Sequence, residues 1–182
     1  MKWIKDSEFI RGKIPMTKYD IRVLTMSYLE ITKGDKFLDI GAGTGSVSVQ
    51  AAVLGADVTA IERAEEGIDL IAENAHKFDV DMEIISGFAP EDLPNEKYNK
   101  VFIGGSRGKL RGMFKYLDEN LNHNGILVGN FIMLKNLNEF LELINEFGYE
   151  DIETKLIQSS SMDRLGLMKA DNPIFIVRGV KK

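Results

Sequence analysis

Two kinds of hydrophobic pattern alternate along the chain. Apolar runs of about four to eight residues, typical of buried strands, end at a glycine or a polar residue. Between them lie longer segments in which apolar residues recur with the spacing of an amphipathic helix. This alternation predicts an α/β fold, with a parallel sheet covered by helices on both faces. We expect helices over residues 17–31, 46–55, 64–78, 109–121 and 136–148, and strands over 36–40, 57–61, 82–86, 100–104 and 125–134.

The first predicted helix shows how the pattern defines a buried face. Ile21, Thr25 and Leu29 recur at helical spacing and fall on one side of this segment. Thr17 is followed three residues later by Asp20, in the manner of a capping box. The pair predicts that the helix begins at this point.

The alternation stops near the end of the chain. Residues 150–161 and 172–179 read as two successive strands with no helix between them. Added to the five strands before them, they predict a seven-stranded, Rossmann-like sheet that is mostly parallel, with one antiparallel strand at its end. The connector over 162–171 is longer than the roughly two to five residues of most hairpin loops. We expect it to serve as a lid over the site or as a contact between subunits.

Composition narrows the class of protein. The chain has 182 residues, of which 44% are hydrophobic, and no repeat or linker divides it, so residues 1–182 are expected to form one domain. It has no cysteine, which excludes disulfides, thiolate zinc sites and cysteine nucleophiles. Its two histidines are too few for a metal cluster, so we expect no metal site. No apolar run is long enough to span a bilayer and no signal peptide is recognisable, so we expect a cytoplasmic protein without a membrane partner.

A glycine-rich loop follows the first predicted strand. Gly41, Gly43 and Gly45 stand where ligands bind in open α/β sheets, beyond the carboxyl end of a strand. Glycine lets the backbone turn sharply there and approach a ligand closely. A dinucleotide fingerprint would have glycine at position 46, whereas this chain has Ser46. The spacing therefore favours a cofactor with a compact head, such as the methionine moiety of S-adenosylmethionine, over a pyrophosphate.

Three further residues are candidates for cofactor contacts. Glu62 ends the second strand, 21 residues after Gly41 (62 − 41), where a carboxylate can accept hydrogen bonds from both ribose hydroxyls. Ala89 follows the third strand and is small enough to border an adenine ring, although Pro90 alone could account for a turn there. Asp39 either caps the glycine loop from inside the sheet or contacts the amino group of the cofactor.

Five segments together resemble one known family. They are "GKIPMTKYDIR", "DIGAGTGSVSVQAA", "SGFAPEDL", "VFIGGSRGKL" and "NPIFIVRG". The glycine loop alone is common to class I methyltransferases, whereas the combination resembles the decarboxylating cobalt-precorrin-6B C15-methyltransferases of cobalamin biosynthesis. The resemblance covers nearly the whole chain.

The resemblance implies an activity, a cofactor and an assembly. It implies methylation of C15 of a cobalt-containing tetrapyrrole, with loss of carbon dioxide from the acetate at C12, and it implies a homotetramer. The segment 1–33 would contribute to the cofactor and substrate site. S-adenosylmethionine would be bound by Thr17, Gly41, Ala42, Gly43, Thr44 and Gly45, with Glu62 at the ribose and Ala89 at the adenine.

The fourth predicted strand is followed by a loop that has almost no side chains. Gly104, Gly105 and Ser106 would leave a wide floor beneath a flat macrocycle. Ser106 and Asn130 are the polar residues expected nearest to this substrate. Arg107 stands where the family pattern often has glycine, and its planar guanidinium suits a substrate carboxylate. No catalytic acid or base is identified. Other candidate cations for an anionic tetrapyrrole are Lys18, Arg22, Lys109, Arg111 and Arg164.

The sequence leaves three other interpretations open. A class I methyltransferase acting on RNA or protein would have the same glycine loop, but the net charge of −5 argues against a nucleic-acid partner. A nucleotide-binding scaffold without turnover would leave Arg107 and the bare strand end without a role. A dehydrogenase is disfavoured by Ser46.

Overall fold

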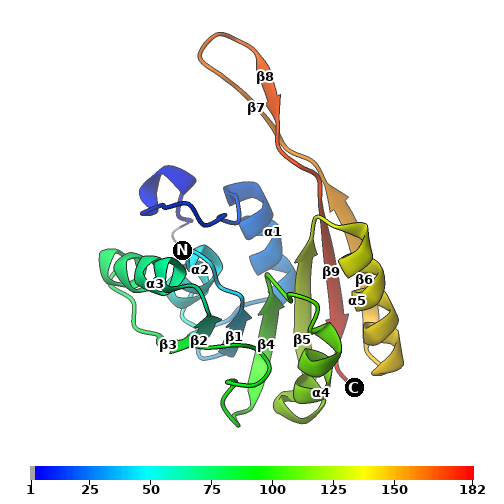
Figure 1. Ribbon diagram of the computed structural model, residues 1–182. Coiled ribbons are helices and arrows are strands. Elements are labelled where there is room, and N and C mark those ends of the chain that lie inside the picture. The colour runs from blue at the N-terminus through cyan, green and yellow to red at the C-terminus, as the bar shows by residue number, and fades with distance from the viewer. Residues whose placement is uncertain (1–2) are drawn as a thin grey trace.

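The computed structural model describes residues 3–182, so positions 1 and 2 of the expected N-terminal segment lie outside the described residues. Figure 1 shows its main sheet, in which seven strands follow the order β3-β2-β1-β4-β5-β9-β6. This order and the helices on both faces confirm the α/β, Rossmann-like fold expected from the hydrophobic pattern. The strands are β1 (Lys36–Ile40), β2 (Asp57–Glu62), β3 (Glu83–Ser86), β4 (Tyr98–Ile103), β5 (Leu121–Phe131), β6 (Glu150–Ile157) and β9 (Ile174–Val180).

Helices cover both faces because the central strands are apolar on both sides. Phe37 of β1 faces the cluster that includes α1 and α2, whereas Leu38 faces the cluster of α4 and α5. Among residues 3–182, no helix is long and apolar enough to cross a membrane. The helices are η1 (Asp6–Glu8), α1 (Tyr19–Leu29), α2 (Ser46–Val53), α3 (Glu65–Lys77), α4 (Leu110–Asn120) and α5 (Leu134–Glu146).

The register of the parallel strands aligns their carboxyl ends. Ile40 of β1 pairs with Ile61 of β2 on one side and with Ile103 of β4 on the other. The residues that follow each strand, Gly41 and Gly104 among them, therefore emerge at one level of the sheet. The Gly104 amide donates to the Ile40 carbonyl at 2.9 Å, which extends the ladder into the loop.

The predicted start of the first helix is wrong. Helix α1 begins at Tyr19, with Lys18 at the N-cap position and no side-chain cap. Thr17 lies outside the helix, where its carbonyl accepts a hydrogen bond from Arg22, and Asp20 bonds to Ser159 instead. The capping-box pattern therefore does not operate, because Lys18 and not Thr17 stands at the N-cap position. The buried face is confirmed, as Ile21, Thr25 and Leu29 are all buried.

The ends of the later elements also differ from expectation. Strand β5 begins at Leu121 and not at 125, because Leu121 pairs with Tyr98 across an irregularity in the ladder. Helix α5 begins at Leu134, two residues before the predicted start (136 − 134). The antiparallel strand β9 lies between β5 and β6, so it is an interior strand and β6 forms the edge of the sheet.

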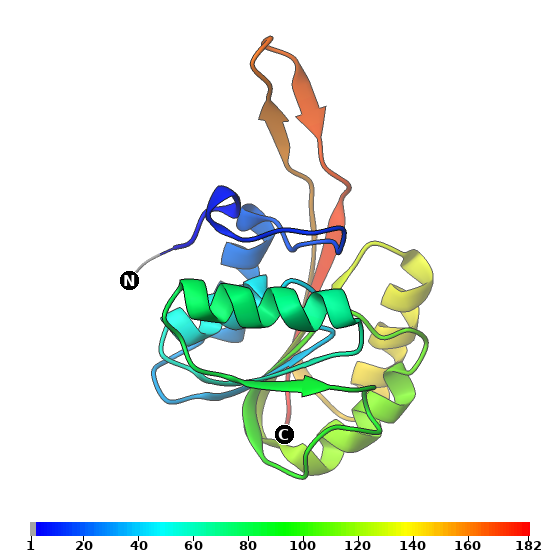
Figure 2. The same ribbon diagram turned by 60° about the vertical axis from the view of Figure 1, so that its left-hand side comes forward.

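The long connector forms a β-ribbon that projects from the body. Strands β7 (Ser160–Met162) and β8 (Met168–Ala170) pair only with each other in the described chain. Figures 1 and 2 both show this ribbon standing clear of the helices and the main sheet. Residues 160–170 line neither cavity described below, so the ribbon is not a lid over the site within a single chain.

Candidate active site

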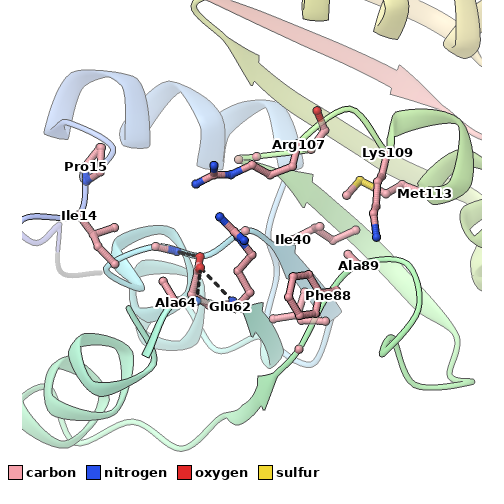
Figure 3. A pocket seen from close by; sticks show the side chains of 18 residues that line it. Ile14, Pro15, Ile40, Glu62, Ala64, Phe88, Ala89, Arg107, Lys109 and Met113 are labelled. Carbon is pink, nitrogen blue, oxygen red and sulfur yellow. Dashed lines mark hydrogen bonds between the residues drawn. The ribbon is translucent and has the colours of Figure 1, made fainter. Parts of the chain in front are cut away.

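A cavity of about 590 Å³ opens at the aligned carboxyl ends of β1, β2 and β4 (Figure 3). Its volume is within the roughly 300–1,000 Å³ range of small-molecule sites. The glycine loop, the end of β2 and the loop after β3 bound it, together with the end of β4. Of the predicted site residues, it is lined by Gly41, Gly43, Glu62, Ala89, Gly104, Gly105, Ser106 and Arg107.

A second cavity of about 180 Å³ adjoins the first. The two share Pro15, Gly41, Gly43 and Gly104, so they lie side by side at the glycine loop. The predicted residues that line only the smaller cavity are Thr17, Ala42 and Asn130. Thr44 and Gly45, the last two residues of the loop, are buried and line neither cavity.

The glycine loop requires glycine for its backbone conformation. Gly41, Gly43 and Gly45 have φ values of 76°, 59° and 73°, in the left-handed region that other residues rarely adopt. A Cβ at Gly41 would also lie 3.0 Å from the backbone nitrogen of Gly105. The first strand end and the fourth therefore approach each other so closely that side chains are excluded between them.

Glu62 is held by three backbone hydrogen bonds. Its Oε2 accepts from the Gly43 amide at 2.9 Å, and its Oε1 accepts from the Arg63 and Ala64 amides, each at 2.9 Å. Figure 3 shows the carboxylate between the glycine loop and the start of α3. The fixed position leaves oxygen lone pairs at the cavity wall as acceptors for a hydroxyl-bearing ligand.

The end of β4 is bare, as the sequence predicts. Gly104 and Gly105 are exposed, and a Cβ placed at Gly105 would meet no atom within 4 Å. Ser106 is buried, and its Oγ has no hydrogen-bond partner in the part of the chain that the structure describes. The floor of the cavity at this end is therefore backbone with one hydroxyl beside it.

Two arginines at the cavity lack an acidic partner. Arg107 is exposed with φ of 48°, and Figure 3 shows its guanidinium pointing over the cavity. Neither Arg107 nor Arg63 forms an ion pair within residues 3–182. Lys109 lines the same cavity but pairs with Glu91 at 2.6 Å. The two guanidiniums and the Glu62 carboxylate line the same cavity, where the positive charges outnumber the negative one.

Other cations predicted for substrate lie elsewhere. Arg22 is fully buried, where it donates to the carbonyls of Ile4 and Thr17 and pairs with Asp6 at 3.2 Å. Burial lowers the pKa of Arg22, an effect that Asp6 opposes. Its prediction as a substrate contact is therefore wrong, because the guanidinium is enclosed. Lys18, Arg111 and Arg164 line neither cavity, and Arg111 pairs with Glu146 at 2.6 Å.

Asp39 contacts a helix and lines neither cavity. It is fully buried in β1, and its Oδ2 accepts a hydrogen bond from the Ser48 hydroxyl of α2 at 2.5 Å. Its Oδ1 has no partner among the described residues. Burial raises the pKa of Asp39 to about 7, the Ser48 hydrogen bond opposes the rise, and the charge of Glu62 adds to it.

Asn130 joins the smaller cavity to α1. Its Nδ2 donates to the Thr25 hydroxyl at 3.0 Å, whereas its buried Oδ1 has no partner in residues 3–182. This bond holds the amide beside the glycine loop, with its carbonyl oxygen enclosed by the protein. No group of three potential metal ligands is found in the described part of the chain.

Several residues that line the larger cavity were missed from the sequence, Ile14, Pro15 and Arg63 among them. Ile14 and Pro15 come from the segment before α1, which folds back over the glycine loop. Arg63 follows Glu62 directly, and its guanidinium lies 5.8 Å from the ring centroid of Phe88. The acidic strand end could have drawn attention to Arg63 as its neighbour. No local pattern identifies Ile14 and Pro15, because their position depends on packing between distant segments.

The strand order and the site define a class of protein. A sheet with one interior antiparallel strand, a glycine loop after β1 and an acidic residue at the end of β2 is the arrangement of class I methyltransferases. The precorrin methyltransferase family model matches residues 9–181, so the chain belongs to this family.

Individual relatives agree with that assignment. The chain is 40% identical to the probable cobalt-precorrin-6B C(15)-methyltransferase (decarboxylating) of Saccharolobus solfataricus, over 98% of this chain and 95% of the relative. The protein of Salmonella typhimurium named for the same reaction is 36% identical, over 96% and 94%. Among solved structures, the precorrin-6y C5,15-methyltransferase of Geobacter metallireducens superposes with a TM-score of 0.91 at 31% identity, covering 99% of this chain and 97% of that one.

Proposed function

We propose that this protein methylates C15 of cobalt-precorrin-6B and removes carbon dioxide from its C12 acetate, as a step of cobalamin biosynthesis. The observation that carries the proposal is the similarity, over nearly the whole chain, to relatives named for this reaction. The bare end of β4 and the unpaired arginines at the cavity support it. The proposal keeps the cytoplasmic location expected from the sequence.

The cavity fits S-adenosylmethionine as the methyl donor. The loop from Gly41 to Gly45 is packed so closely against neighbouring segments that a Cβ would meet them, and Glu62 offers a carboxylate at a fixed place beside it. We assign Glu62 to the ribose and Ala89 to the border of the adenine. Thr17 and the backbone from Gly41 to Gly45 would hold the methionine end and the loop around it. When bound, the cofactor supplies an electrophilic methyl group.

The substrate side of the cavity suits a flat anion. A precorrin carries several acetate and propionate groups, so local cations must attract it to a protein of net charge −5. Arg107 would donate hydrogen bonds to one substrate carboxylate, and Gly104 and Gly105 would leave room for the macrocycle. Ser106 and Asn130 are the polar groups nearest to the bound ring.

Both chemical steps depend mainly on position. Methylation of an electron-rich ring carbon requires that the carbon lie in line with the methyl–sulfur bond, and a rigid site supplies this alignment. Loss of carbon dioxide leaves an electron pair, and the conjugated macrocycle itself accepts it. The role of the chain is to orient the ring and to limit access of water. No residue is assigned as a catalytic acid or base.

The same proposal includes a homotetramer of this chain. Large apolar side chains on the projecting ribbon are exposed, and an isolated two-stranded ribbon is marginally stable in water. A second copy of the chain would bury them, as subunit interfaces bury apolar surface. The most exposed are Met162, Leu165, Leu167 and Met168.

Mass spectrometry tests the activity. The protein would be incubated without oxygen with S-adenosylmethionine and cobalt-precorrin-6B, and we expect a product that has gained one methyl group and lost carbon dioxide. Gain of methyl alone would retain the methyltransferase and remove decarboxylation from the proposal. No turnover in a protein that binds the cofactor would favour an RNA or protein methyltransferase. The tRNA methyltransferase of Aquifex aeolicus, at 16% identity and a TM-score of 0.76, shares the fold alone.

A further inference from the structure

The segment before α1 forms one wall of both cavities. This N-terminal strap (residues 3–18) contributes Ile14 and Pro15 to the larger cavity, and Pro15 and Thr17 to the smaller one. Figure 2 shows the strap in dark blue, above α3. A Cβ at Gly43 would lie 3.3 Å from the Pro15 carbonyl oxygen. The strap and the glycine loop are therefore in contact at this point, beside the place assigned to the cofactor.

One buried amide joins these two segments. Asn74 of α3 is fully buried, and its Nδ2 donates to the Ile10 carbonyl of the strap and to the Thr44 carbonyl of the glycine loop, each at 3.1 Å. Its Oδ1 accepts from the Ile10 amide at 2.8 Å. Both donors and the acceptor of this side chain are thus used to link three separate segments.

Other anchors of the strap bond to helices, and among them the Ser46 hydroxyl, at the start of α2, donates to the Thr17 carbonyl at 3.5 Å. Gln50 accepts from the Ile4 amide, and Glu66 accepts from the Lys13 amide at 2.6 Å, so these side chains tie the strap to α2 and α3. Arg22 ties it to α1 through the carbonyls of Ile4 and Thr17. Asn74 differs from them because its second donor bonds to the loop itself.

We propose that Asn74 is a positioning residue for the cofactor: by bonding to Ile10 and Thr44, it holds the strap and the glycine loop at the separation that S-adenosylmethionine requires. The inference rests on the proposed function, which places the methionine end of the cofactor against Thr17 of the strap and the glycine loop. Asn74 lines neither cavity, so its effect passes through the two backbones that it joins. A wall held in place before binding spares the ligand the cost of ordering it.

A pair of matched variants tests the proposal. Asn74→Ala removes the links to the strap and the loop, whereas Asn120→Ala removes another buried amide, which donates to the Tyr116 carbonyl at 3.0 Å and lines neither cavity. We expect both to lower Tm. By calorimetry, Asn74→Ala should raise the Kd for S-adenosylmethionine about tenfold or more, because misplaced binding groups lose affinity steeply. Asn120→Ala should stay within about twofold of wild type.

Kinetics separate positioning from general loss of stability. In Asn74→Ala, the KM for S-adenosylmethionine should rise by a larger factor than kcat falls, because saturating cofactor restores the spacing. A Tm lowered as in Asn120→Ala, with an unchanged Kd, would overturn the proposal and leave Asn74 a purely structural residue.

Hydrogen exchange in the wild-type protein covers the case in which Asn74→Ala does not fold. Saturating S-adenosylmethionine should slow exchange of the Ile10 amide, although Ile10 lines neither cavity. Slower exchange at Gly43 with no change at Ile10 would contradict the coupling. A wild-type protein that binds no S-adenosylmethionine would instead refute the proposed function, and with it the role assigned to Asn74.

Discussion

Arg22 and Arg107 look alike in the sequence, but the structure gives them opposite environments. Both stand near segments expected at the site, and a charged residue is normally solvated. Arg22 is enclosed because the strap folds over it and supplies two carbonyls and the Asp6 carboxylate. Arg107 stays exposed at the cavity. The sequence contains no local signal that distinguishes them, since burial depends on contacts between distant segments.

Residues whose role depends on the local backbone were easier to predict. The sequence predicted a sharp backbone turn at Gly41, Gly43 and Gly45, and all three have positive φ, with Glu62 beside them at the end of β2. The strap residues Ile14 and Pro15 could not be found in this way. Their place at the cavity is set by the fold of the whole N-terminal segment.

Replacing the acidic strand-end residue should weaken cofactor binding. In Glu62→Gln, one oxygen is replaced by an amide nitrogen, which cannot accept the backbone hydrogen bonds now made by that oxygen. We expect the Kd for S-adenosylmethionine, measured by calorimetry, to rise about tenfold or more. Glu65→Gln is the control, because Glu65 is exposed in the first turn of α3 and lines neither cavity. Equal effects of both changes would argue for general electrostatics in place of a specific contact.

Removing the unpaired cation should affect the tetrapyrrole and spare the cofactor. Arg107→Gly should raise the KM for the tetrapyrrole about tenfold, by loss of a charge-assisted hydrogen bond, with the Kd for S-adenosylmethionine unchanged. The same change should increase the unfolding free energy by up to about 1 kcal/mol, because glycine accepts the positive φ at this position without strain. Steady-state kinetics and urea unfolding measure the two effects.

The matched variant for this position is Arg111→Ala. Arg111 carries the same charge four residues later (111 − 107) but pairs with Glu146, so its loss should leave the KM for the tetrapyrrole near the wild-type value. If Arg111→Ala raised the KM as much as Arg107→Gly, long-range attraction and not a direct contact would explain the effect.

At the scale of elements, the hydrophobic patterns identified the helices and the strands of the main sheet, but the first residues of some of them were misplaced. Helices α1 to α5 and the seven strands of the main sheet were expected from the hydrophobic pattern, although β6, at the edge of the sheet, has most of its side chains exposed. The start of α1 was misplaced because Lys18, which no capping pattern marks, stands at the N-cap, and the start of β5 was misplaced because Leu121 pairs with Tyr98 across an irregularity in the ladder. The projecting ribbon has exposed side chains on both strands, so no alternation marks it in the sequence.

The contact between β1 and α2 should make stability depend on pH. Asp39 has its pKa raised from 3.8 to about 7 in the folded protein, so between these values the folded chain retains a proton that the unfolded chain releases. The unfolding free energy therefore falls as pH rises through this window, and is level above it. In Asp39→Asn, urea unfolding should show a smaller fall, the difference from wild type being at most about 4 kcal/mol.

An exposed carboxylate provides the comparison for that measurement. Asp57→Asn, at the exposed start of β2, should keep the wild-type dependence on pH. A slope in Asp39→Asn identical to that of wild type would show that the buried carboxylate does not carry the effect.

At the scale of the whole molecule, the site and the ribbon lie at the same end of the sheet. The parallel strands have their carboxyl ends here, and the ribbon continues from the carboxyl end of β6. Figure 1 shows it rising on that side of the body. If copies of the chain assemble through the ribbon, a second copy would therefore lie near the cavities, although the ribbon does not cover the glycine loop of its own chain.

Loss of apolar side chains from the ribbon should change the assembly. The double variant Leu165→Ser with Leu167→Ser removes side chains that are 85% and 63% exposed, and we expect the mass measured by light scattering to fall below that of a tetramer. Leu134→Ser removes an equally exposed leucine, at 63%, from the start of α5 and should leave the mass unchanged. A mass that is the same in all three proteins would place the subunit contacts elsewhere.

The interior position of β9 determines the order in which the sheet can be completed during synthesis. Strand β5 ends at Phe131 and its neighbour begins at Ile174, so 43 residues (174 − 131) are translated before that side of β5 can be paired. At about 5–20 residues per second, this edge stays open on the ribosome for seconds, while β1 to β4 already have their neighbours. Strand β6, made in the interval, cannot join the sheet until β9 enters between them. The half of the sheet that carries the glycine loop can thus assemble well before the half that carries the ribbon.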